Sequence, residues 1–482
     1  MAETIPHWLT KQAHLDPDQT AIEYENGGSI TFSELERKSR AFASKLASLG
    51  IKKGSHVALL SGNSEKMIIS LHAISYLGAV AVMLNTRLTE AELTHQITDA
   101  EVSIILTGED ERFKAMSFPV ESYAMQEVER FAEMEVKLAE EINLDEPFTI
   151  IYTSGTTGFP KGVIHTYGNH WWSAVSSALN LGLNQEDKWL MAMPIFHVSG
   201  LSILMKSVIY GMPIFMMEKF DPERAHHAIM EKGITIISVV TVMVQRLLRQ
   251  LGEEKYPKAF RCMLLGGGPA PKPLLEEAEK LGIPVFQSYG MTETSSQIVT
   301  LSPKDALTKI GSAGKPLMPA QLKICGKDDE GIGEIHVKGP MVTRGYYKNS
   351  QASERAFSDG WLATGDLGRL DKDGFLYVVD RRKDLIISGG ENIYPSEIES
   401  VLSGMEQIKE VGVTGVEDQT WGQVPAAFIV KSREVSEGEI CAYARKFLAG
   451  YKIPKYFYFI KELPRNASNK IVRSALTDQM DE

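Results

Sequence analysis

Short hydrophobic runs alternate with amphipathic stretches between residues 57 and 297, and this alternation predicts the fold. Short apolar runs bounded by turn residues are typical of buried strands, whereas apolar residues three and four apart are typical of helices. Strands that alternate with helices in this way favour a parallel, doubly wound sheet. The alternation occurs twice, which predicts two stacked α/β subdomains. Predicted strands occupy residues 57–60, 79–84, 102–106, 213–217, 234–239 and 262–265, and predicted helices cover 65–77 and begin at residue 90.

A hairpin and a helix are predicted before this pattern begins. Residues 26–28 read Asn-Gly-Gly, a turn sequence between the apolar runs of residues 23–32. Thr31 and Glu34 have the spacing of a capping box, which predicts the start of a helix. Gly50 ends that helix. Its apolar stripe contains Leu35, Phe42, Leu46 and Leu49.

The pattern changes twice in the C-terminal part of the chain. Short apolar runs separated by glycine turns predict a small, mostly β subdomain after residue 309, with strands at 321–325, 333–338, 361–366 and 375–379. A charged segment at residues 380–384 then precedes a unit of roughly 100 residues, an ordinary size for a small domain. In this unit we expect a helix that begins at Pro395, strands at 410–416 and 426–431, and a helix near 438–448.

Composition narrows the class of protein. The 482 residues exceed what a single core usually serves, so at least two domains are expected. A net charge of -11 disfavours a nucleic-acid partner. No apolar signal core is visible at the N-terminus, and the apolar stretches near 202–217 and 234–244 are interrupted or too short to span a membrane. The three cysteines are scattered without metal-binding spacing, so we expect a cytoplasmic enzyme without membrane insertion.

The segment Thr153-Ser-Gly-Thr-Thr-Gly-Phe-Pro-Lys-Gly162 carries the strongest chemical signal. It follows an apolar run at residues 148–152 that predicts a buried strand. Glycines allow backbone N–H groups to approach phosphate oxygens, hydroxyl groups donate hydrogen bonds, and Lys161 supplies a compact positive charge. Pro160 and Gly162 stand where a Walker A loop has glycine and serine or threonine, which excludes that motif. A phosphate-binding loop is favoured over an ordinary surface turn.

Further segments follow this loop in a defined order. They are Leu-Leu-Gly-Gly-Gly-Pro at 264–269, Gln-Ser-Tyr-Gly-Met-Thr-Glu at 287–293, Thr-Gly-Asp at 364–366, Tyr-Val-Val-Asp-Arg at 377–381 and Pro-Arg-Asn-Ala-Ser-Asn-Lys at 464–470. As an ordered set they resemble the acyl- and aryl-CoA synthetases, the adenylate-forming superfamily that includes nonribosomal peptide adenylation domains and firefly luciferase. The resemblance covers nearly the whole chain. It implies an α/β fold in which a large N-terminal domain, of two α/β subdomains plus a small β subdomain (residues 1–382), is hinged to a small, mobile α/β C-terminal domain (residues 383–482).

The resemblance also implies roles for individual residues. Lys161, Glu293 and Lys470 would be catalytic, Glu293 would hold Mg²⁺, and Lys383 would be the interdomain hinge. Tyr289 offers a face for a purine, and Asp366, at the end of a strand, suits ribose hydroxyls. Residues expected to bind ATP are Thr153, Ser154, Gly155, Thr156, Thr157, Gly158, Lys161, Gly267, Gly268, Ser288, Tyr289, Gly290, Met291, Thr292, Asp366 and Arg381. Those expected to bind the acid are His197, Thr241, Gly266 and Thr292, and those on the path of coenzyme A are Ser388, Gly389 and Gly390.

The implied reaction joins a small carboxylic acid to coenzyme A at the expense of ATP. Lys470 would act while the carboxylate attacks the α-phosphate, and the C-terminal domain would then rotate so that residues 388–391 face the incoming thiol. Asn469 stands where the family usually has glycine, and asparagine tolerates left-handed backbone angles. A chain without a carrier domain favours free coenzyme A as acceptor. The oligomeric state is not indicated, and a homo-oligomer is among the states considered.

For the acid, the segments at 196–202 and 237–243 look most like those of the o-succinylbenzoate–CoA ligases of menaquinone biosynthesis. A benzoate-type aryl-CoA ligase is the near alternative. A luciferase-like oxygenase would share the adenylation motifs. A non-catalytic nucleotide-binding regulator is a further alternative, against which the presence of both Lys161 and Lys470 argues.

Overall fold

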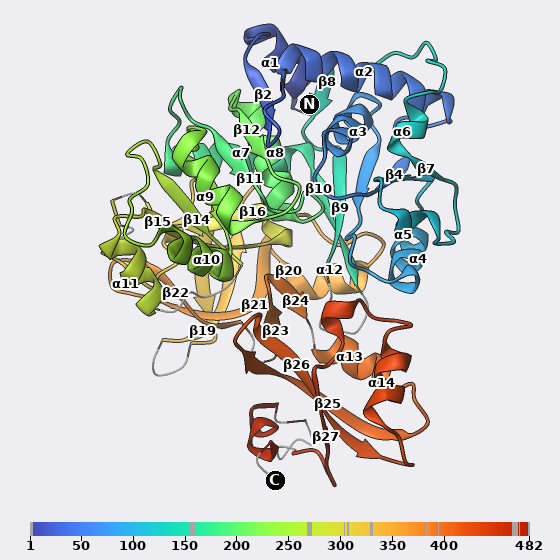
Figure 1. Ribbon diagram of the computed structural model, residues 1–482, viewed down its shortest axis with the longest axis vertical. Helices are drawn as coiled ribbons and strands as arrows, with labels where there is room; N and C mark the ends of the chain where they lie inside the picture. Colours follow the sequence, from blue (N-terminus) through green and yellow to red (C-terminus); the bar gives the residue numbers. More distant parts are fainter. Residues whose placement is uncertain are drawn as a thin grey trace.

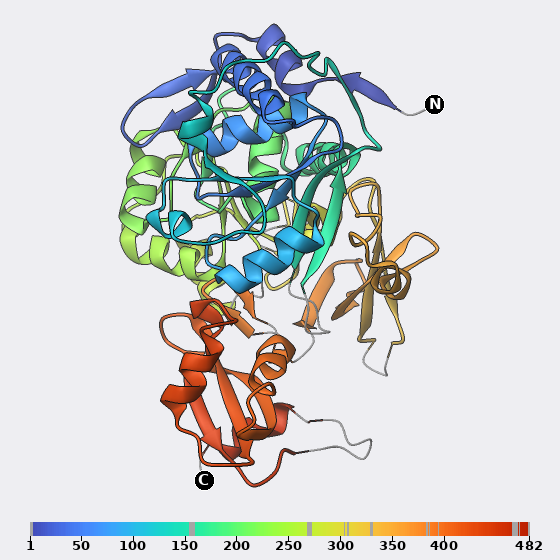
Figure 2. The same cartoon turned by 90° about the vertical axis from the view of Figure 1, so that its right-hand side faces the viewer.

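The computed structural model describes residues 3–153, 160–267, 272–302, 304–305, 308–327, 331–381, 384, 386–393, 395–464, 471 and 473–480. Figure 1 shows a large upper part that contains the N-terminus and a smaller part, in orange and red, that ends at the C-terminus below it. Figure 2, turned by 90°, shows a third body in ochre at the side of the large part. The predicted division into two α/β subdomains, a small β subdomain and a C-terminal α/β part is confirmed.

The first sheet has the strand order β10-β9-β5-β4-β6-β7. All its neighbouring strands are parallel except β10, which pairs antiparallel with β9. The predicted strand–helix alternation is therefore confirmed, with one antiparallel edge. The strands are β4 (His56–Leu60), β5 (Val80–Met83), β6 (Ile104–Thr107), β7 (Ser122–Ala124), β9 (Pro147–Thr153) and β10 (Lys161–Thr166), and the helices are α3 (Glu65–Tyr76), α4 (Glu90–Asp99), α5 (Glu111–Lys114) and α6 (Met125–Val128).

The second sheet has the order β17-β16-β15-β14-β13-β11-β12-β2-β3. Its central strands are parallel, and β3, β16 and β17 are antiparallel at the edges. Its strands are β2 (Thr20–Tyr24), β3 (Ser29–Thr31), β11 (Trp189–Met191), β12 (Ile214–Met216), β13 (Ile236–Val239), β14 (Cys262–Leu265), β15 (Val285–Met291), β16 (Ser296–Thr300) and β17 (Lys315–Pro316). Its helices are α7 (Tyr167–Leu181), α8 (Val198–Tyr210), α9 (Pro222–Glu231), α10 (Thr241–Leu251) and α11 (Lys272–Lys280).

The predicted hairpin and the helix after it are both present. Strands β2 and β3 form the hairpin, and it lies in the second sheet because β2 pairs parallel with β12. Helix α2 (Phe32–Ser48) begins with the predicted capping box. Its Glu34 N–H donates to the Thr31 hydroxyl at 3.2 Å, and the Thr31 N–H donates to the Glu34 carboxylate at 2.9 Å. The capping box thus satisfies backbone donors that a helix start leaves unpaired.

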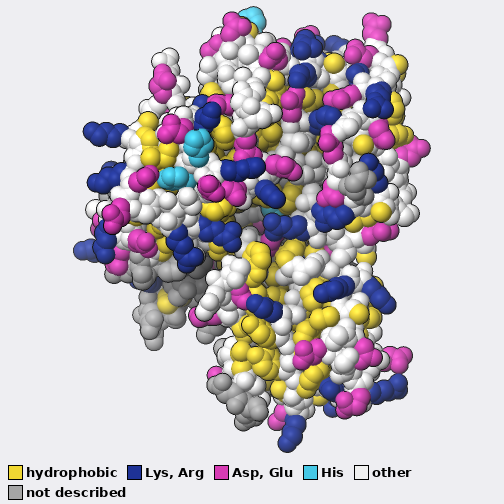
Figure 3. Space-filling model, in the orientation of Figure 1, with side chains coloured by type: hydrophobic (Ala, Val, Ile, Leu, Met, Phe, Trp, Pro, Cys, Tyr) yellow, Lys and Arg dark blue, Asp and Glu magenta, His cyan; other side chains and the backbone are white. Residues whose placement is uncertain are grey.

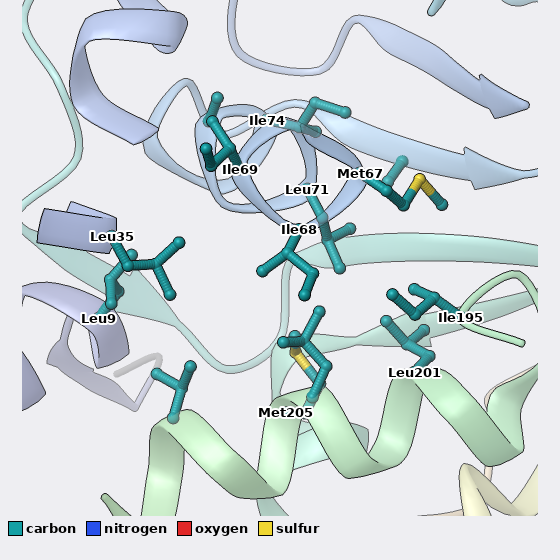
Figure 4. Packing of buried hydrophobic residues seen from close by; sticks show 14 of the residues in the cluster. Leu9, Leu35, Met67, Ile68, Ile69, Leu71, Ile74, Ile195, Leu201 and Met205 are labelled. Carbon is teal, nitrogen blue, oxygen red and sulfur yellow. The ribbon is translucent and has the colours of Figure 1, made fainter. Parts of the chain in front are cut away.

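The main core lies between the two α/β subdomains. In α3 every residue from Met67 to Tyr76 is buried, as are those of α8 from Gly200 to Val208, and helices apolar on all sides belong in an interior. Figure 4 shows Ile68 and Leu71 of α3 pointing toward Leu201 and Met205 of α8. Helix α1 (Trp8–Leu15) and α2 close the cluster. The two sheets are thereby fixed to each other, and a site between them has rigid walls.

Three smaller sheets complete the described structure, the first a two-stranded sheet of β1 (Thr4–Pro6) and β8 (Glu141–Asn143). The β subdomain has the order β18-β19-β21-β20, with β22 paired to β21, and the C-terminal part has the order β24-β23-β26-β25, with β27 paired to β26. Among the described residues no helix combines the length and apolarity needed to cross a membrane. The β subdomain contains β18 (Gln321–Cys325), β19 (Gly333–Lys338), α12 (Ser350–Ala356), β20 (Phe357–Ser358), β21 (Trp361–Leu370) and β22 (Leu376–Arg381). The C-terminal part contains β23 (Ile386–Ser388), β24 (Glu391–Ile393), α13 (Pro395–Leu402), β25 (Ile408–Asp418), β26 (Gly422–Lys431), α14 (Glu437–Ala444) and β27 (Tyr456–Phe459).

The predicted division at residues 382 and 383, and the predicted hinge Lys383, lie outside the described residues. The domain boundary therefore stays a prediction. The helix predicted near 438–448 is shorter than expected, since α14 ends at Ala444.

Candidate active site

A cavity of about 910 Å³ lies where the two α/β subdomains, the β subdomain and the C-terminal part meet. In Figure 3 the surface is hollowed between the large part and the C-terminal part, with charged side chains along the rim. Most of the predicted site residues that the structure describes line this cavity. They are Thr153, Lys161, His197, Gly266, Gly267, Ser288, Gly290, Met291, Thr292, Glu293, Asp366 and Gly390.

The predicted phosphate loop joins two antiparallel strands. Thr153 ends β9 and Lys161 begins β10, and the two residues are opposite each other in the ladder. Ser154, Gly155, Thr156, Thr157 and Gly158 lie outside the described residues. A Walker A loop leads into a helix, so the strand that follows agrees with the exclusion of that motif. Both ends of the loop, Thr153 and Lys161, line the cavity.

Glu293 lies opposite Lys161 on a short turn that follows β15. Its side chain is buried, and the Tyr346 hydroxyl donates to its Oε1 at 3.0 Å. The Lys161 ammonium group is 5.1 Å from the centre of the same Tyr346 ring. Partial burial lowers the pKa of Lys161, Arg355 adds to this shift, and the carboxylate of Glu293 opposes it. Tyr346 and Arg355, which were not among the sequence candidates, also line the cavity.

The residues at this end of the cavity fit a nucleotide-bound Mg²⁺. The described residues contain no group of three or more His, Cys, Asp or Glu side chains that could hold a metal ion by themselves. Mg²⁺ is usually held by one or two carboxylates together with phosphate oxygens and water. A single carboxylate, Glu293, beside the lysine of the predicted phosphate loop meets that requirement.

Asp366 also lines the cavity, and the predicted position in its strand is wrong. We expected Asp366 to end a strand, but β21 continues to Leu370 because β22 pairs with it. Gly365, at a φ of 76°, and a register irregularity after Leu367 interrupt the regular ladder here. The Asp366 carboxylate is buried and lines the cavity. Arg381 ends β22, beyond the strand end predicted at residue 379, and is directly opposite Asp366 in the ladder.

The purine-stacking role of Tyr289 stays a prediction. Its side chain is buried in the apolar cluster of the β subdomain and is not among the described residues that line the cavity. Its hydroxyl donates to Asp366 Oδ2 at 2.8 Å. In this arrangement the Tyr289 hydroxyl helps to fix the orientation of the Asp366 carboxylate.

Three further candidates are not among the described residues that line the cavity. Thr241 begins α10, and its neighbours Val239 and Val240 line the cavity instead. Of the residues predicted on the coenzyme A path, Gly390 lines the cavity whereas Ser388 and Gly389 do not. Gly268 lies outside the described residues, as does Lys470.

The turn between β23 and β24 brings the C-terminal part to the mouth of the cavity. A Cβ atom on Gly390, whose φ is 87°, would lie 3.4 Å from Val240 Cγ2. Glu391 follows, with its carboxylate 2.7 Å from Arg87 Nη1 and 3.3 Å from His197 Nε2. Burial raises the pKa of Glu391, but His197, Arg87 and Lys452 outweigh burial and leave it below its usual value. His197 therefore lies at the contact between the two parts as well as on the cavity wall.

A second contact holds the C-terminal part in this orientation. The Lys452 ammonium group is 2.8 Å from Glu92 of α4 and 2.7 Å from Glu397 of α13. All three side chains are buried. Breaking a buried pair by removing one partner typically costs 3–5 kcal/mol, so these contacts favour one orientation of the C-terminal part.

Lys206 is the most unusual residue of the cavity, and we did not predict a role for it. It lies in the apolar helix α8, is only 1% exposed, and donates to Gln297 Oε1 at 2.9 Å. Burial lowers the pKa of Lys206 to about 7. A lysine inside an otherwise apolar helix was the signal in the sequence, but only the fold shows that it reaches the cavity. A fully buried lysine is rare without an anionic partner.

Comparison with known proteins gives the family of this chain. Residues 9–347 match the AMP-binding enzyme family, and residues 397–470 match the AMP-binding enzyme C-terminal domain. The chain is 60% identical over 480 residues to the 2-succinylbenzoate–CoA ligase of Oceanobacillus iheyensis, covering 99% of this chain and 100% of that protein.

Two solved structures of the o-succinylbenzoate CoA synthetase of Bacillus subtilis are also similar. Each is 47% identical and covers 99% of both chains. The double mutant bound with its product analogue OSB-NCoA has a TM-score of 0.94, and the complex with the acyl-adenylate intermediate OSB-AMP has a TM-score of 0.77. Both the sequence match and these relatives lead to one conclusion: the chain belongs to the AMP-binding enzyme family.

Proposed function

We propose that this chain is an AMP-forming acid–CoA ligase that converts 2-succinylbenzoate into its coenzyme A thioester. The observation that carries the proposal is that one cavity is lined by Lys161 and Glu293 and also by the buried Lys206. Lys161 and Glu293 are joined there through Tyr346, and Lys206 is the buried lysine of helix α8. The ligase is proposed to act in menaquinone biosynthesis, in the cytoplasm.

The first half-reaction activates the acid. An oxygen of one substrate carboxylate attacks the α-phosphorus of ATP, and the bond from that phosphorus to the pyrophosphate oxygen breaks. Lys161 would hold the pyrophosphate, Asp366 the ribose hydroxyls, and Lys470 the pair of anions that react. Mg²⁺, when bound at Glu293, would neutralise charge that develops on the phosphates. Because the reacting groups are both anionic, fixed cations are the main catalytic contribution available to the protein.

The second half-reaction transfers the acyl group to coenzyme A. The thiolate sulfur attacks the carbonyl carbon, and the bond to AMP breaks. The similarity to the structure with a thioester analogue is greater than that to the structure with the adenylate, although the same protein and the same share of the chain are compared. This difference supports an orientation suited to the thioester step, with Gly390 and Glu391 at the cavity mouth. Rotation about a hinge near Lys383 would bring Lys470 back for the first step.

Lys206 supports a dicarboxylic acid as the substrate. The cavity that Lys206 lines also has apolar lining residues, among them Met193 and Phe196. An acid with one carboxylate would leave the Lys206 amine without an anionic partner when that carboxylate reacts at the α-phosphate. A second carboxylate on the substrate would pair with Lys206, and such a buried charge pair gives strong discrimination against analogues that lack it. A benzoate-type substrate has no group for this position.

Product analysis tests the proposed function. With 2-succinylbenzoate, ATP and coenzyme A, we expect one thioester and one pyrophosphate for each AMP released, measured by mass spectrometry and a coupled phosphate assay. The rate should depend on coenzyme A and should not change when oxygen is removed. Oxygen uptake or light emission would instead support a luciferase-like oxygenase, and ATP binding without pyrophosphate release would support a nucleotide-binding regulator.

A further inference from the structure

Tyr346 contacts both charged groups at the phosphate end of the cavity. Its hydroxyl donates to Glu293 Oε1 at 3.0 Å, and the Lys161 ammonium group lies over its ring at 5.1 Å from the centre. A cation above an aromatic ring is attracted to it, and a hydrogen bond to a carboxylate fixes the direction of that carboxylate. One side chain therefore restrains the ammonium group of Lys161, on β10 of the first sheet, and the carboxylate of Glu293, in the turn between β15 and β16 of the second sheet.

The backbone around Tyr346 is itself fixed to the strands that carry those two groups. Tyr346 forms an antiparallel bridge with Val163 of β10, and the next residue, Tyr347, donates its N–H to the Gly162 carbonyl at 2.7 Å. On the other side, the Thr343 N–H donates to the Glu293 carbonyl at 2.8 Å. These backbone hydrogen bonds fix the position of Tyr346, so its hydroxyl has a defined position relative to Glu293.

The backbone of the Glu293 turn is held independently. The fully buried His165 of β10 lies with Nε2 2.7 Å from the Thr292 carbonyl, and the Ser173 hydroxyl donates to the Ser295 carbonyl at 2.9 Å. Ser295 and Ser296 have positive φ angles of 55° and 124°, which are unfavourable for residues other than glycine. Because these contacts already fix the turn, removing the Tyr346 hydroxyl changes the carboxylate and leaves the turn in place.

We propose that Tyr346 is a positioning residue that orients the Glu293 carboxylate and the Lys161 ammonium group for Mg·ATP before the nucleotide binds. This inference rests on the proposed function, because it takes Glu293 as the metal ligand and Lys161 as the phosphate ligand. Tyr346 acts through these two residues and has no bond-making role of its own.

Tyr346→Phe tests the inference, with Tyr347→Phe as the matched control. The control removes a neighbouring hydroxyl that donates to Glu101 Oε2 at 3.0 Å on the surface. Binding is measured by calorimetry with α,β-methylene-ATP in the presence and absence of Mg²⁺, and with AMP. Loss of a hydrogen bond to a charged group lowers a binding constant by about tenfold or more. We therefore expect Tyr346→Phe to weaken Mg²⁺-dependent binding of the ATP analogue by roughly tenfold. AMP affinity should stay at the wild-type value, and Tyr347→Phe should match wild type in both assays.

Kinetics supply a second readout. The Mg²⁺ concentration for half-maximal pyrophosphate release should rise by roughly tenfold in Tyr346→Phe, while thioester formation from synthetic acyl-adenylate and coenzyme A should stay unchanged. Equal behaviour of the two variants would overturn the inference. A parallel loss of AMP affinity in Tyr346→Phe would also overturn it, because that result indicates a structural role. Failure of the proposed function is separate, since wild type itself would then release no pyrophosphate.

Discussion

Replacing Lys206 by methionine is expected to lower kcat/KM for 2-succinylbenzoate by roughly 10²–10³-fold, because truncating one partner of a buried charge pair costs several kcal/mol. The substrate carboxylate that pairs with Lys206 would then be buried without a counter-charge. ATP affinity should stay unchanged, since Lys206 lies in the wall formed by α8. Methionine has a similar shape, and replacing a buried charge by an apolar group is often neutral or stabilising, so thermal denaturation should show an intact fold.

The control for Lys206 is a pair of monocarboxylate analogues, 4-oxo-4-phenylbutanoate and 2-butanoylbenzoate. The analogue that keeps the activated carboxylate should be used equally well by wild type and Lys206→Met, since it lacks the group that Lys206 binds.

The pH dependence of KM gives a further check. Burial lowers the pKa of Lys206 to about 7, so free enzyme loses this proton above pH 7 and binding of the dicarboxylate must restore it. KM should therefore rise with pH above about 7 in wild type and stay flat in the variant. An equal loss with all acids would mean that Lys206 only shapes the cavity.

Replacing Lys470 by alanine is expected to separate the two half-reactions. Removing one preorganised charged donor from a transition state costs roughly 10²–10³-fold in rate. Adenylate formation should fall by that factor with a modest change in ATP affinity. Thioester formation from synthetic acyl-adenylate should keep a rate close to that of wild type, because the proposed rotation moves Lys470 out of the site before the thiol enters.

Single-turnover kinetics of each half-reaction measure this difference, and Lys461→Ala is a matched control. Lys461 is an exposed lysine of the same C-terminal part. If both half-reactions slow together in Lys470→Ala, Lys470 has a structural role or contacts coenzyme A. Asn469 before it would slow wild-type adenylation if its turn forms poorly, and the difference between the half-reactions would then be smaller.

Local sequence patterns predicted those parts of the fold that depend on near neighbours. The capping box of Thr31 and Glu34 is present because both partners lie within one helical turn. The strand before the phosphate loop is present because its apolar residues are buried on both faces of a parallel sheet. The same holds for the cavity residues that occur in short motifs, since the resemblance placed Lys161, Glu293 and Asp366 in one site and the structure brings all three to one cavity.

Features that depend on long-range pairing were not predictable in this way. The β2–β3 hairpin joins the second sheet through β12, which no local pattern indicates. Asp366 was expected at a strand end because Thr-Gly-Asp is typical of a turn, but pairing with β22 extends β21 beyond it. Tyr289 was assigned to the purine by its motif, and its packing in the apolar cluster of the β subdomain with its hydroxyl on Asp366 was not predicted. In each case tertiary contacts outweigh a local preference.

The contacts between the large part and the C-terminal part were equally inaccessible to sequence reasoning. Glu391 was recognised within a motif, but its partners Arg87 and His197 come from segments that are distant in the chain. Lys452, which joins Glu92 and Glu397, carries no motif of its own. A charged residue in such a position resembles any solvated lysine until the fold shows its burial.

The acid specificity of the wild-type enzyme tests the central claim most directly. Initial rates of coenzyme A thioester formation are compared for 2-succinylbenzoate, its two monocarboxylate analogues, benzoate and octanoate. A site built to pair with a substrate group rejects analogues without it strongly, so kcat/KM for 2-succinylbenzoate should exceed that of every other acid by roughly 100-fold or more. Equal or higher kcat/KM with octanoate or benzoate would contradict the assignment of the acid, and would leave only an acid–CoA ligase of another specificity.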